Sequence, residues 1–287
     1  MSLAKRFVFI ISIVLLTVSI TADAPFYAQN THHAQAGKQM IMTSSSAVQD
    51  GITVITYNIH HGRDMSGHDN LDSIVQEIHS SGAQIIALQE VDRHMPRSGF
   101  KDQVKYIADQ LSMYYAYGKT IDILGIEYGN VVISAFPILK QENMILPGNS
   151  IEPRALLKTE IAVGNDIYNV WATHLGLSRE DRFKQIDAIN AALEQADKPT
   201  ILLGDFNSVY SSDEISGISD RLKDVAVLLG KGDVATYAYG DNAPDVRIDY
   251  IWVTDDISSV EYYVNPLGIS DHASVVARLL LNDKKRF

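Results

Sequence analysis

The sequence contains no cysteine, so disulfide bonds, thiolate metal ligands and a cysteine nucleophile are all excluded. It is also short of basic residues: 24 lysines and arginines stand against 35 aspartates and glutamates, which gives a formal net charge of −11. A surface of that sign repels phosphate backbones at long range, which counts against a general nucleic-acid coat protein. An enzyme that holds a local cation in its cleft remains compatible with this charge.

Long apolar runs are confined to the first residues of the chain. Lys5 and Arg6 precede a largely apolar stretch over residues 7–20, and small residues follow in an A-x-A arrangement that ends at Ala24. This order is typical of a secretory signal peptide. At about 1.5 Å per residue the stretch spans roughly 21 Å, less than the roughly 30 Å of a bilayer core. We expect a signal peptide over residues 1–24 and a secreted protein, with an uncleaved N-terminal membrane anchor as the alternative.

The rest of the chain has the composition of a folded protein. Apolar residues make up 46% and charged residues 21% of the sequence, which is ordinary globular usage. Residues 25–50 show no periodicity and are rich in Gln, Ser and Ala, which predicts a flexible linker. No internal repeat and no break in composition follows Gly51. We therefore expect one domain over residues 51–287.

Within this domain, helical and strand patterns alternate. Apolar residues at helical spacing predict helices over residues 70–82, 101–115 and 178–199. Short β-branched and apolar runs predict strands over residues 52–59, 84–90, 130–138, 154–163, 166–175, 200–207, 247–254 and 272–281. Because hairpins are mixed with helical crossovers, the sheets should contain both parallel and antiparallel strands, as in an α/β domain.

Amide, carboxylate and imidazole side chains stand at the ends of five predicted strands. They are Asn58, Glu90, His174, the pair Asp205 and Asn207, and the pair Asp271 and His272. Where strands end together, such side chains can converge on a single cleft. Oxygen donors without thiolates suit Mg²⁺ or Mn²⁺, and the imidazoles are then free for proton transfer or for stabilising charge on phosphate. Taken singly, each residue also has a structural explanation, such as a turn former or a satisfied core histidine.

Such a set meets the needs of phosphodiester cleavage. That reaction requires an aligned water, a cation to absorb charge on the phosphoryl oxygens, and help for the leaving alkoxide. His272 close to Asp249 would form a base and its orienting partner, which fixes the imidazole tautomer and raises its basicity.

Seven segments carry a resemblance to a known family. They are ITVITYNIHHG, IIALQEVDR, YGNVVISAFPI, WATHLGL, ILLGDFNS, RIDYIWV and SDHASVVARL. Their order resembles that of the endonuclease/exonuclease/phosphatase superfamily, over nearly the whole chain after Gly51. The resemblance implies a DNase I-like fold: an α/β (α+β) four-layer sandwich of two packed mixed β-sheets flanked by helices. The spacing of these segments is most similar to a bacterial secreted branch, which itself resembles the lipid-remodelling domain of glycosylphosphatidylinositol anchor processing.

The resemblance also implies a metal site. Glu90 corresponds to the principal magnesium ligand, and Asn58 and Asp271 to groups beside the metal. Mg²⁺ is the implied cofactor, and Mn²⁺ is an alternative. Several family nucleases carry a second carboxylate where this chain has His60, so schemes that need two metals are in doubt.

The catalytic roles are implied in the same way. His174 corresponds to the residue that stabilises the scissile phosphate or serves as general acid. Asp205 corresponds to the group that orients or deprotonates water, and Asn207 to the one that holds a phosphate oxygen. Asp249 corresponds to the partner of His272, which acts as base or electrostatic clamp.

Two further residues are candidates for contact with substrate phosphate. His60, followed by His61, lies beside Asn58 in the sequence, and the guanidinium of Arg154 suits a phosphate oxygen. Arg93 is a candidate of the same kind. For both arginines a structural ion pair is the alternative.

These observations favour a secreted, divalent-metal-dependent phosphoesterase that hydrolyses small phosphodiesters or phospholipid headgroups by in-line attack of water. An extracellular nuclease is the second interpretation, weakened because lysines and arginines near the aromatic loops are scattered among acidic neighbours. A catalytically silent binding module on the same fold is the third. The presence of Glu90, Asp205 and His272 counts against it. The substrate is the only partner we expect, with no obligate protein partner.

Overall fold

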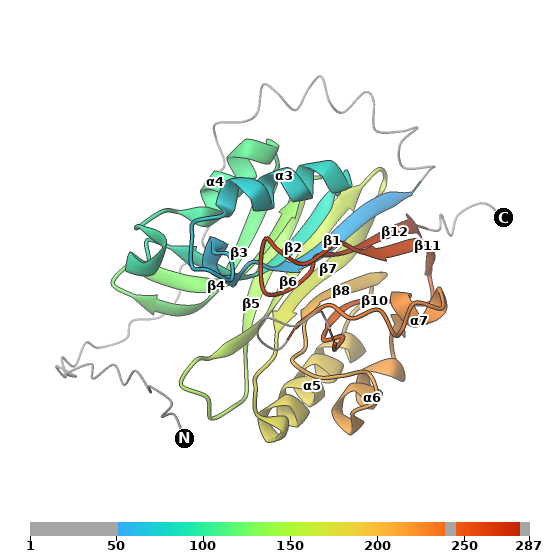
Figure 1. Cartoon of the computed structure of the whole chain (residues 1–287). Helices are drawn as coiled ribbons and strands as arrows, with labels where there is room; N and C mark the ends of the chain where they lie inside the picture. Colours follow the sequence, from blue (N-terminus) through green and yellow to red (C-terminus); the bar gives the residue numbers. More distant parts are fainter. Residues whose placement is uncertain (1–50, 239–244, 282–287) are drawn as a thin grey trace, which may run out of the picture. The chain divides into compact units, whose positions relative to one another are not determined.

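Two six-stranded β-sheets pack face to face between two layers of helices in the computed structural model, which describes residues 51–238 and 245–281 (Figure 1). The predicted signal peptide (1–24) and linker (25–50) lie outside the described residues. The expected α/β sandwich of two mixed sheets is confirmed. Within the described ranges, none of the helices has the length and apolar character needed to span a membrane.

The first sheet has the strand order β11-β12-β1-β2-β4-β3. Its strands are β1 (Ile52–Asn58), β2 (Ile85–Arg93), β3 (Tyr114–Ile123), β4 (Ile126–Ser134), β11 (Ile257–Val264) and β12 (Val275–Leu281). β1 and β2 are parallel, and every other neighbouring pair is antiparallel. The crossover from β1 to β2 passes through the short 3-10 helix η2 (His60–Gly62) and helix α3 (Leu71–Ser81).

The second sheet repeats this plan with the order β5-β6-β7-β8-β10-β9. Its strands are β5 (Ile138–Leu146), β6 (Arg154–Val163), β7 (Asp166–His174), β8 (Thr200–Asp205), β9 (Lys223–Asp224) and β10 (Asp249–Val253). β7 and β8 are parallel and are joined through α5 (Arg179–Glu194), whose first turn is capped by the hydroxyl of Ser178. Each sheet therefore has one parallel pair near its centre.

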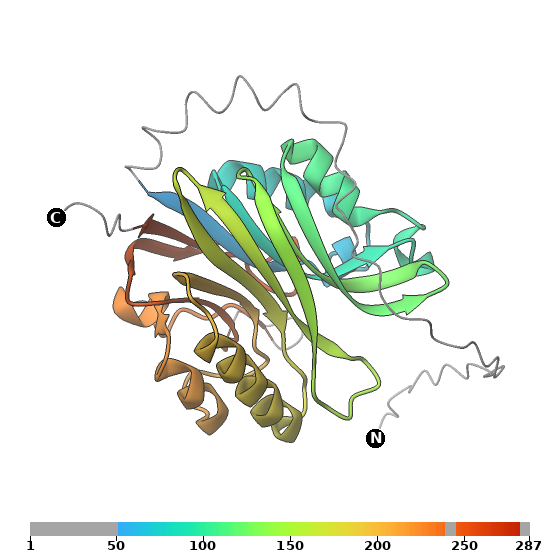
Figure 2. The ribbon, with the colours of Figure 1, turned by 180° about the vertical axis from the view of Figure 1, so that it is seen from behind.

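Alternation along the strands divides the core into layers. Side chains such as Val54, Ala172 and Leu203 lie between the sheets. The opposite face of the first sheet packs against α3 and α4 (Gln103–Leu111), and that of the second against α5 and α6 (Asp213–Ser219) (Figures 1 and 2). The short helices η3 (Pro96–Ser98) and α7 (Val225–Leu228) complete the described elements. Burial of each Val, Leu or Ile contributes about 1.5–3 kcal/mol, so these layers hold together without covalent cross-links.

Most of the predicted elements are present, and the differences concern the end of one helix and three strands at the sheet edges. The three predicted helices are confirmed as α3, α4 and α5, but α4 ends at Leu111 because Ser112 adopts a left-handed conformation with a φ of 54°. The strands β3, β5 and β11 were not predicted. All three lie at sheet edges and are exposed at many positions, so they lack the continuous apolar runs that mark central strands.

Gly204 is the position where the central parallel pair of the second sheet tolerates no side chain. A Cβ atom there would lie 2.0 Å from the carbonyl oxygen of Thr173 on β7. We expect Gly204→Ala to lower the free energy of unfolding by about 1–3 kcal/mol, the usual cost of overpacking, measured by urea titration. Gly217→Ala in α6 is the matched control, since its Cβ would meet its nearest neighbours at 3.6 Å. Equal stability of the two variants would contradict this account.

Candidate active site

The polar strand ends meet at one edge of the sandwich, and Asn58 lies between the two sheets there. Its Nδ2 donates to Glu90 Oε1 and to Asp205 Oδ2, both at 3.1 Å. Glu90 belongs to β2 of the first sheet and Asp205 to β8 of the second. The Asn58 Oδ1 accepts the backbone N–H of His60 at 3.1 Å. Asn58 thus fixes the distance between two carboxylates that come from different sheets.

Glu90 reaches the site because β2 is irregular at that point. The register with β4 shifts between Leu88 and Val91, and Glu90 has a φ of 61°. His60 and His61, with φ values of 44° and 55°, share this left-handed conformation, and the Nδ1 of His61 lies 3.1 Å from Glu90 Oε2. Left-handed backbone costs about 1–3 kcal/mol for each residue other than glycine. Such strain is typical of a functional site.

Asp205, Asp249 and His272 form a compact buried group. Their ligand atoms all lie within 4.8 Å of one another. His272 Nδ1 is 2.9 Å from Asp249 Oδ2, which also accepts the hydroxyl of Thr236 at 2.7 Å, and His272 Nε2 lies 3.6 Å from Asp205 Oδ2. Burial opposes protonation of His272, but Asp249 and Asp205 outweigh it and raise the pKa of the imidazole.

The pKa of Asp205 is raised as well, which suits this carboxyl to proton transfer. Burial raises the pKa of this carboxyl above its ordinary value; the nearby His272 opposes the rise, and Asp249 adds to it. A carboxyl and an imidazole with their pKa values raised next to one another can exchange a proton near neutral pH. The group is therefore suited to proton transfer.

His174 ends β7 on the opposite side of Asp205. Its Nε2 lies 3.4 Å from Asp205 Oδ2 and 3.0 Å from Asn207 Nδ2, and its Nδ1 lies 3.0 Å from Arg154 Nη1. Burial, followed by the charge of Arg154, lowers the pKa of His174 well below its ordinary value. The ring is therefore neutral in the free protein, in contrast to that of His272.

The structure brings the predicted site residues other than Arg93 to this edge. Asp271, whose carboxylate raises the pKa of Glu90, is held by the hydroxyl of Ser270 at 3.2 Å. Arg154 lies beside His174 and 2.6 Å from Glu152. Arg93 does not join them, because it is paired at 2.8 Å with Asp102 and at the same distance with Glu127. For Arg93 the structural ion pair is thus the arrangement observed.

Several residues at the site were missed or left unassigned by sequence reasoning. His61 contacts Glu90, Ser270 donates to the carbonyl of Asn58 at 2.8 Å, and the ring of Tyr237 lies 4.6 Å from that of His272. His61 and Ser270 adjoin predicted motifs, so the NIHHG and SDH segments carry a signal for them. Thr236 and Tyr237 lie in an irregular segment that has no such signal.

The donor set fits a divalent cation. Burial raises the pKa of Glu90, and although Asn58 lowers it, the negative charge of Asp271 raises it again. Two half-buried carboxylates that repel each other are stabilised by a hard cation between them, and carboxylate oxygens are the ligands that Mg²⁺ prefers. Glu90 and Asp271 are the residues that would hold it. Asn58 directs its amide nitrogen at the carboxylates, so its role here is to orient them.

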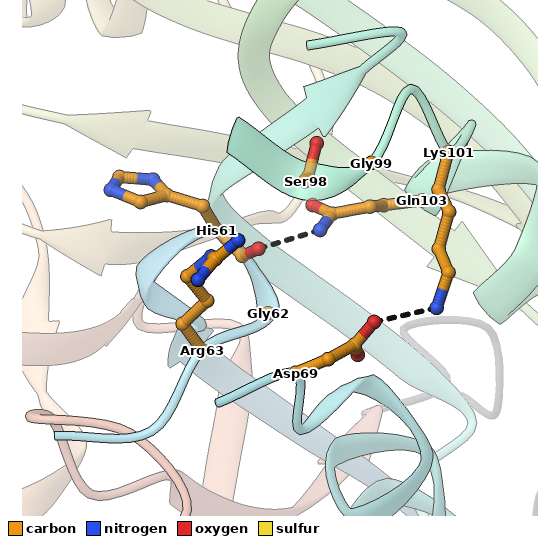
Figure 3. Close-up of a pocket in the computed structure, with 8 residues that line it drawn as sticks. All are labelled: His61, Gly62, Arg63, Asp69, Ser98, Gly99, Lys101 and Gln103. Atoms are coloured by element: carbon orange, nitrogen blue, oxygen red, sulfur yellow. Dashed lines mark hydrogen bonds and ion pairs between the residues drawn. The ribbon is translucent and has the colours of Figure 1, made fainter. Parts of the chain in front are cut away.

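A small pocket lies next to this site. Its volume is about 140 Å³, and it is bounded by the segment from His61 to Asp69 and by residues 98–103 (Figure 3). The imidazole of His61 points away from it, while its carbonyl oxygen accepts the side-chain amide of Gln103 at 2.6 Å. Lys101 and Asp69 form an ion pair of 2.6 Å across the pocket wall. Polar groups of both signs therefore line this pocket.

A second polar network fixes the loops that carry His174 and Asn207. Arg182 donates to the carbonyl of Leu177 at 2.7 Å and to Glu214 at 2.9 Å. Glu214 also accepts the hydroxyl of Ser208 at 2.8 Å. The loops that follow β7 and β8 are thereby tied together behind the site.

This fold and this donor set define a protein of the DNase I-like class of α/β sandwiches. The chain belongs to the Endonuclease/Exonuclease/phosphatase family, whose model matches residues 55–272. Members of this family are generally hydrolases of phosphoester bonds.

Individual relatives agree with this assignment. The uncharacterized protein YbhP of Escherichia coli is 27% identical over 257 residues, which cover 81% of this chain and 98% of that protein. Protein cwh43 of Schizosaccharomyces pombe is 25% identical over 150 residues, or 52% of this chain and 15% of that protein. The crystal structure of an endonuclease/exonuclease/phosphatase from Beutenbergia cavernae has a TM-score of 0.67 at 25% identity, covering 81% of this chain and 72% of that one.

Glu214→Gln tests the loop network through its pH dependence. Burial would raise the pKa of Glu214, but hydrogen bonds from the backbone, Ser208 and Arg182 lower it to about 2. A folded pKa below the ordinary value of 4.5 means that the carboxylate stabilises the fold above pH 4.5 and loses this effect as the pH falls towards 2. We expect the variant to be less stable by about 2–3 kcal/mol at pH 7.

Urea unfolding at pH 7 and pH 3 measures this difference, which should shrink at the lower pH. Glu180→Gln is the control, since Glu180 is exposed and is paired only with Lys184 on the same helix. A difference for Glu214→Gln that stays the same at both pH values would contradict the pKa assignment.

Proposed function

We propose that this protein is a divalent-metal-dependent phosphodiesterase that cleaves its substrate by in-line attack of water. The observation that carries the proposal is the convergence of three kinds of group on one edge of the sandwich. These are the paired carboxylates of Glu90 and Asp271, the proton-transfer group of Asp205 and His272, and the neutral imidazole of His174. Each supplies one requirement of phosphodiester cleavage.

The proposed roles follow from the geometry. Glu90 and Asp271 would hold a divalent cation, which would stabilise negative charge on the phosphoryl oxygens. Asp205 orients the water and, with His272 beside it, receives the proton that the water loses as its oxygen bonds to phosphorus. The bond from phosphorus to the leaving oxygen breaks, and that oxygen takes up a proton from solvent water. His174 and Asn207 face the same space and contact the phosphoryl group.

A phospholipid headgroup, or a small phosphodiester like it, is the substrate class that we favour. Loops at the same edge expose apolar side chains; these are Met65, Phe100, Ile151, Leu177, Val209 and Tyr210. Their immediate neighbours in the sequence are mainly Gly and Ser, and the charged ones are Asp64, Lys101 and Glu152. A nuclease would surround its site with lysine and arginine, because phosphate contacts dominate the affinity for nucleic acids. Apolar loop tips suit the surface of a lipid assembly.

Two of these apolar side chains, Ile151 and Leu177, lie on segments that are tied to the start of α5. Ile151 lies in the loop between β5 and β6, which projects beside the first turn of α5 (Figure 2). That loop is fastened to the helix by the backbone N–H of Asn149, which donates to Asp181 at 3.1 Å. Leu177, 77% exposed, lies just before the same helix.

We also propose that the protein is secreted, on the basis of residues 1–24. Secretion would place such an apolar surface outside the cytoplasm.

Hydrolysis of bis-p-nitrophenyl phosphate by the purified protein tests the enzymatic class. We expect turnover with Mg²⁺ or Mn²⁺ that is abolished by a chelator. Glu90→Gln and His272→Ala should each lower kcat by about 10²–10⁴-fold, the usual contribution of a general acid, base or charge-stabilising group. Glu261→Gln, on the exposed strand β11, is the control. If no phosphoester is hydrolysed with any divalent metal, the silent binding module replaces this proposal.

The substrate class is tested with phosphatidylcholine and sphingomyelin vesicles, glycerophosphodiesters and plasmid DNA. We expect lipid or small diesters to be cleaved, and Ile151→Ser combined with Leu177→Ser to lower the ratio of vesicle to soluble-substrate activity by about tenfold, as loss of two inserted apolar side chains would. Leu139→Ser, on an exposed position of β5, is the matched control. Nicking of plasmid DNA together with inert lipids would favour the nuclease instead.

A further inference from the structure

His174 is held between hydrogen-bonding groups on both of its ring nitrogens. Only 5% of the residue is exposed. Arg154 Nη1 lies 3.0 Å from its Nδ1, and Asn207 Nδ2 lies 3.0 Å from its Nε2. A neutral imidazole carries one N–H and one lone pair, so it can accept a hydrogen bond at only one nitrogen. The two neighbours therefore favour opposite tautomers.

Arg154 and Asn207 differ in how strongly each donates a hydrogen bond to His174. A guanidinium has five N–H donors, no acceptor and a permanent charge, so Arg154 requires a lone pair on Nδ1 of His174. This cation also disfavours a second positive charge on the adjacent ring. The contact with Asn207 is weaker, because a neutral amide donates less strongly than a charged guanidinium.

We propose that Arg154 is a positioning residue that fixes His174 as the tautomer with its proton on Nε2. The proposal deepens the phosphodiesterase function given above and rests on it for its catalytic consequence. It assigns Arg154 to the histidine, whereas sequence reasoning assigned it to the substrate phosphate.

The surroundings of Arg154 hold its guanidinium beside His174. It begins β6, is 7% exposed, and its Nη1 lies 2.6 Å from Glu152 Oε1. Residue 156 of β6 pairs with residue 173 of β7, next to His174. The backbone of two hydrogen-bonded strands thus sets the distance between guanidinium and imidazole, and Glu152 balances the buried charge.

The tautomer decides what the site presents to a phosphoryl oxygen. Asn207 Nδ2 also donates to the carbonyl of Leu175 at 2.9 Å, which keeps the amide nitrogen facing the site. With the proton of His174 on Nε2, two donors lie side by side, and Asp205 Oδ2 is the acceptor near them at 3.4 Å. A phosphoryl oxygen accepts from both donors. With the proton on Nδ1, the Nε2 lone pair would repel that oxygen and would bind Asn207 instead.

Histidine ¹⁵N NMR spectra of the metal-free protein, recorded without substrate, test the tautomer directly. In the wild type we expect an unprotonated Nδ1 and a protonated Nε2 for His174, assigned by their loss in His174→Gln. Arg154→Met should move the proton of His174 wholly or partly to Nδ1. Arg154→Lys, which keeps a cation that can only donate, should preserve the Nε2–H form. A wild-type Nδ1–H form, or a tautomer unchanged in Arg154→Met, overturns the proposal.

Kinetics test the consequence. Arg154→Met should lower kcat for a soluble phosphodiester by about 10²-fold, the effect of losing one preorganised donor, with little change in KM, and Arg154→Lys should recover part of the loss. Arg93→Met is the matched control, since Arg93 is paired with carboxylates away from His174. A higher KM with unchanged kcat would mean that Arg154 grips the phosphate, and would overturn the proposal.

The two kinds of measurement separate this proposal from the proposed function. The NMR result needs neither turnover nor metal. The expected tautomers in a protein that hydrolyses no phosphoester would support the positioning role and reject the phosphodiesterase. Should Arg154→Met fail to fold, Arg154→Lys still decides, because a shift of its His174 proton to Nδ1 contradicts the inference.

Discussion

The side-chain amide of Asn58 joins the two sheets at the edge where the polar strand ends meet. One NH₂ group donates to a carboxylate from each sheet, at 3.1 Å in both cases. Without those bonds, two buried carboxylates of like charge would be held close together with nothing to keep them apart or to set their angles. The register of both sheets, the bulge at Glu90 and the left-handed turn at His60 all serve to place the partners of this amide.

The site concentrates unfavourable features that the remainder of the domain must support. It holds carboxylates with raised pKa values and several residues in left-handed backbone. The pKa of His272 is raised, whereas that of His174 is lowered. Apolar layers on both faces of each sheet provide the stability that offsets them. Such a division, with a rigid apolar frame around a strained polar edge, is what a preorganised catalytic site requires.

Sequence reasoning reached the fold class and the identity of the polar strand ends because both are encoded locally. Central strands such as β1 and β8 are continuous apolar runs, and the residues that end them stand out by contrast. The edge strands β3, β5 and β11 were missed because consecutive residues in them are exposed or half-buried, so they show neither a continuous apolar run nor a clean alternation. The sequence also names Arg154 and His174 but not their contact, which depends on the register of β6 against β7.

The position of β1 has a consequence for when this site comes into being. β1 lies between β2 and β12, so residues near the start of the folded domain pair with residues near its end. His272 and Asp271, just before β12, join Asn58 and Glu90 only once that pairing forms. A chain emerging during synthesis therefore holds Asn58 and Glu90 long before it holds Asp271 and His272. The site is completed only when the last strand docks, and such long-range pairing makes this a late event in folding.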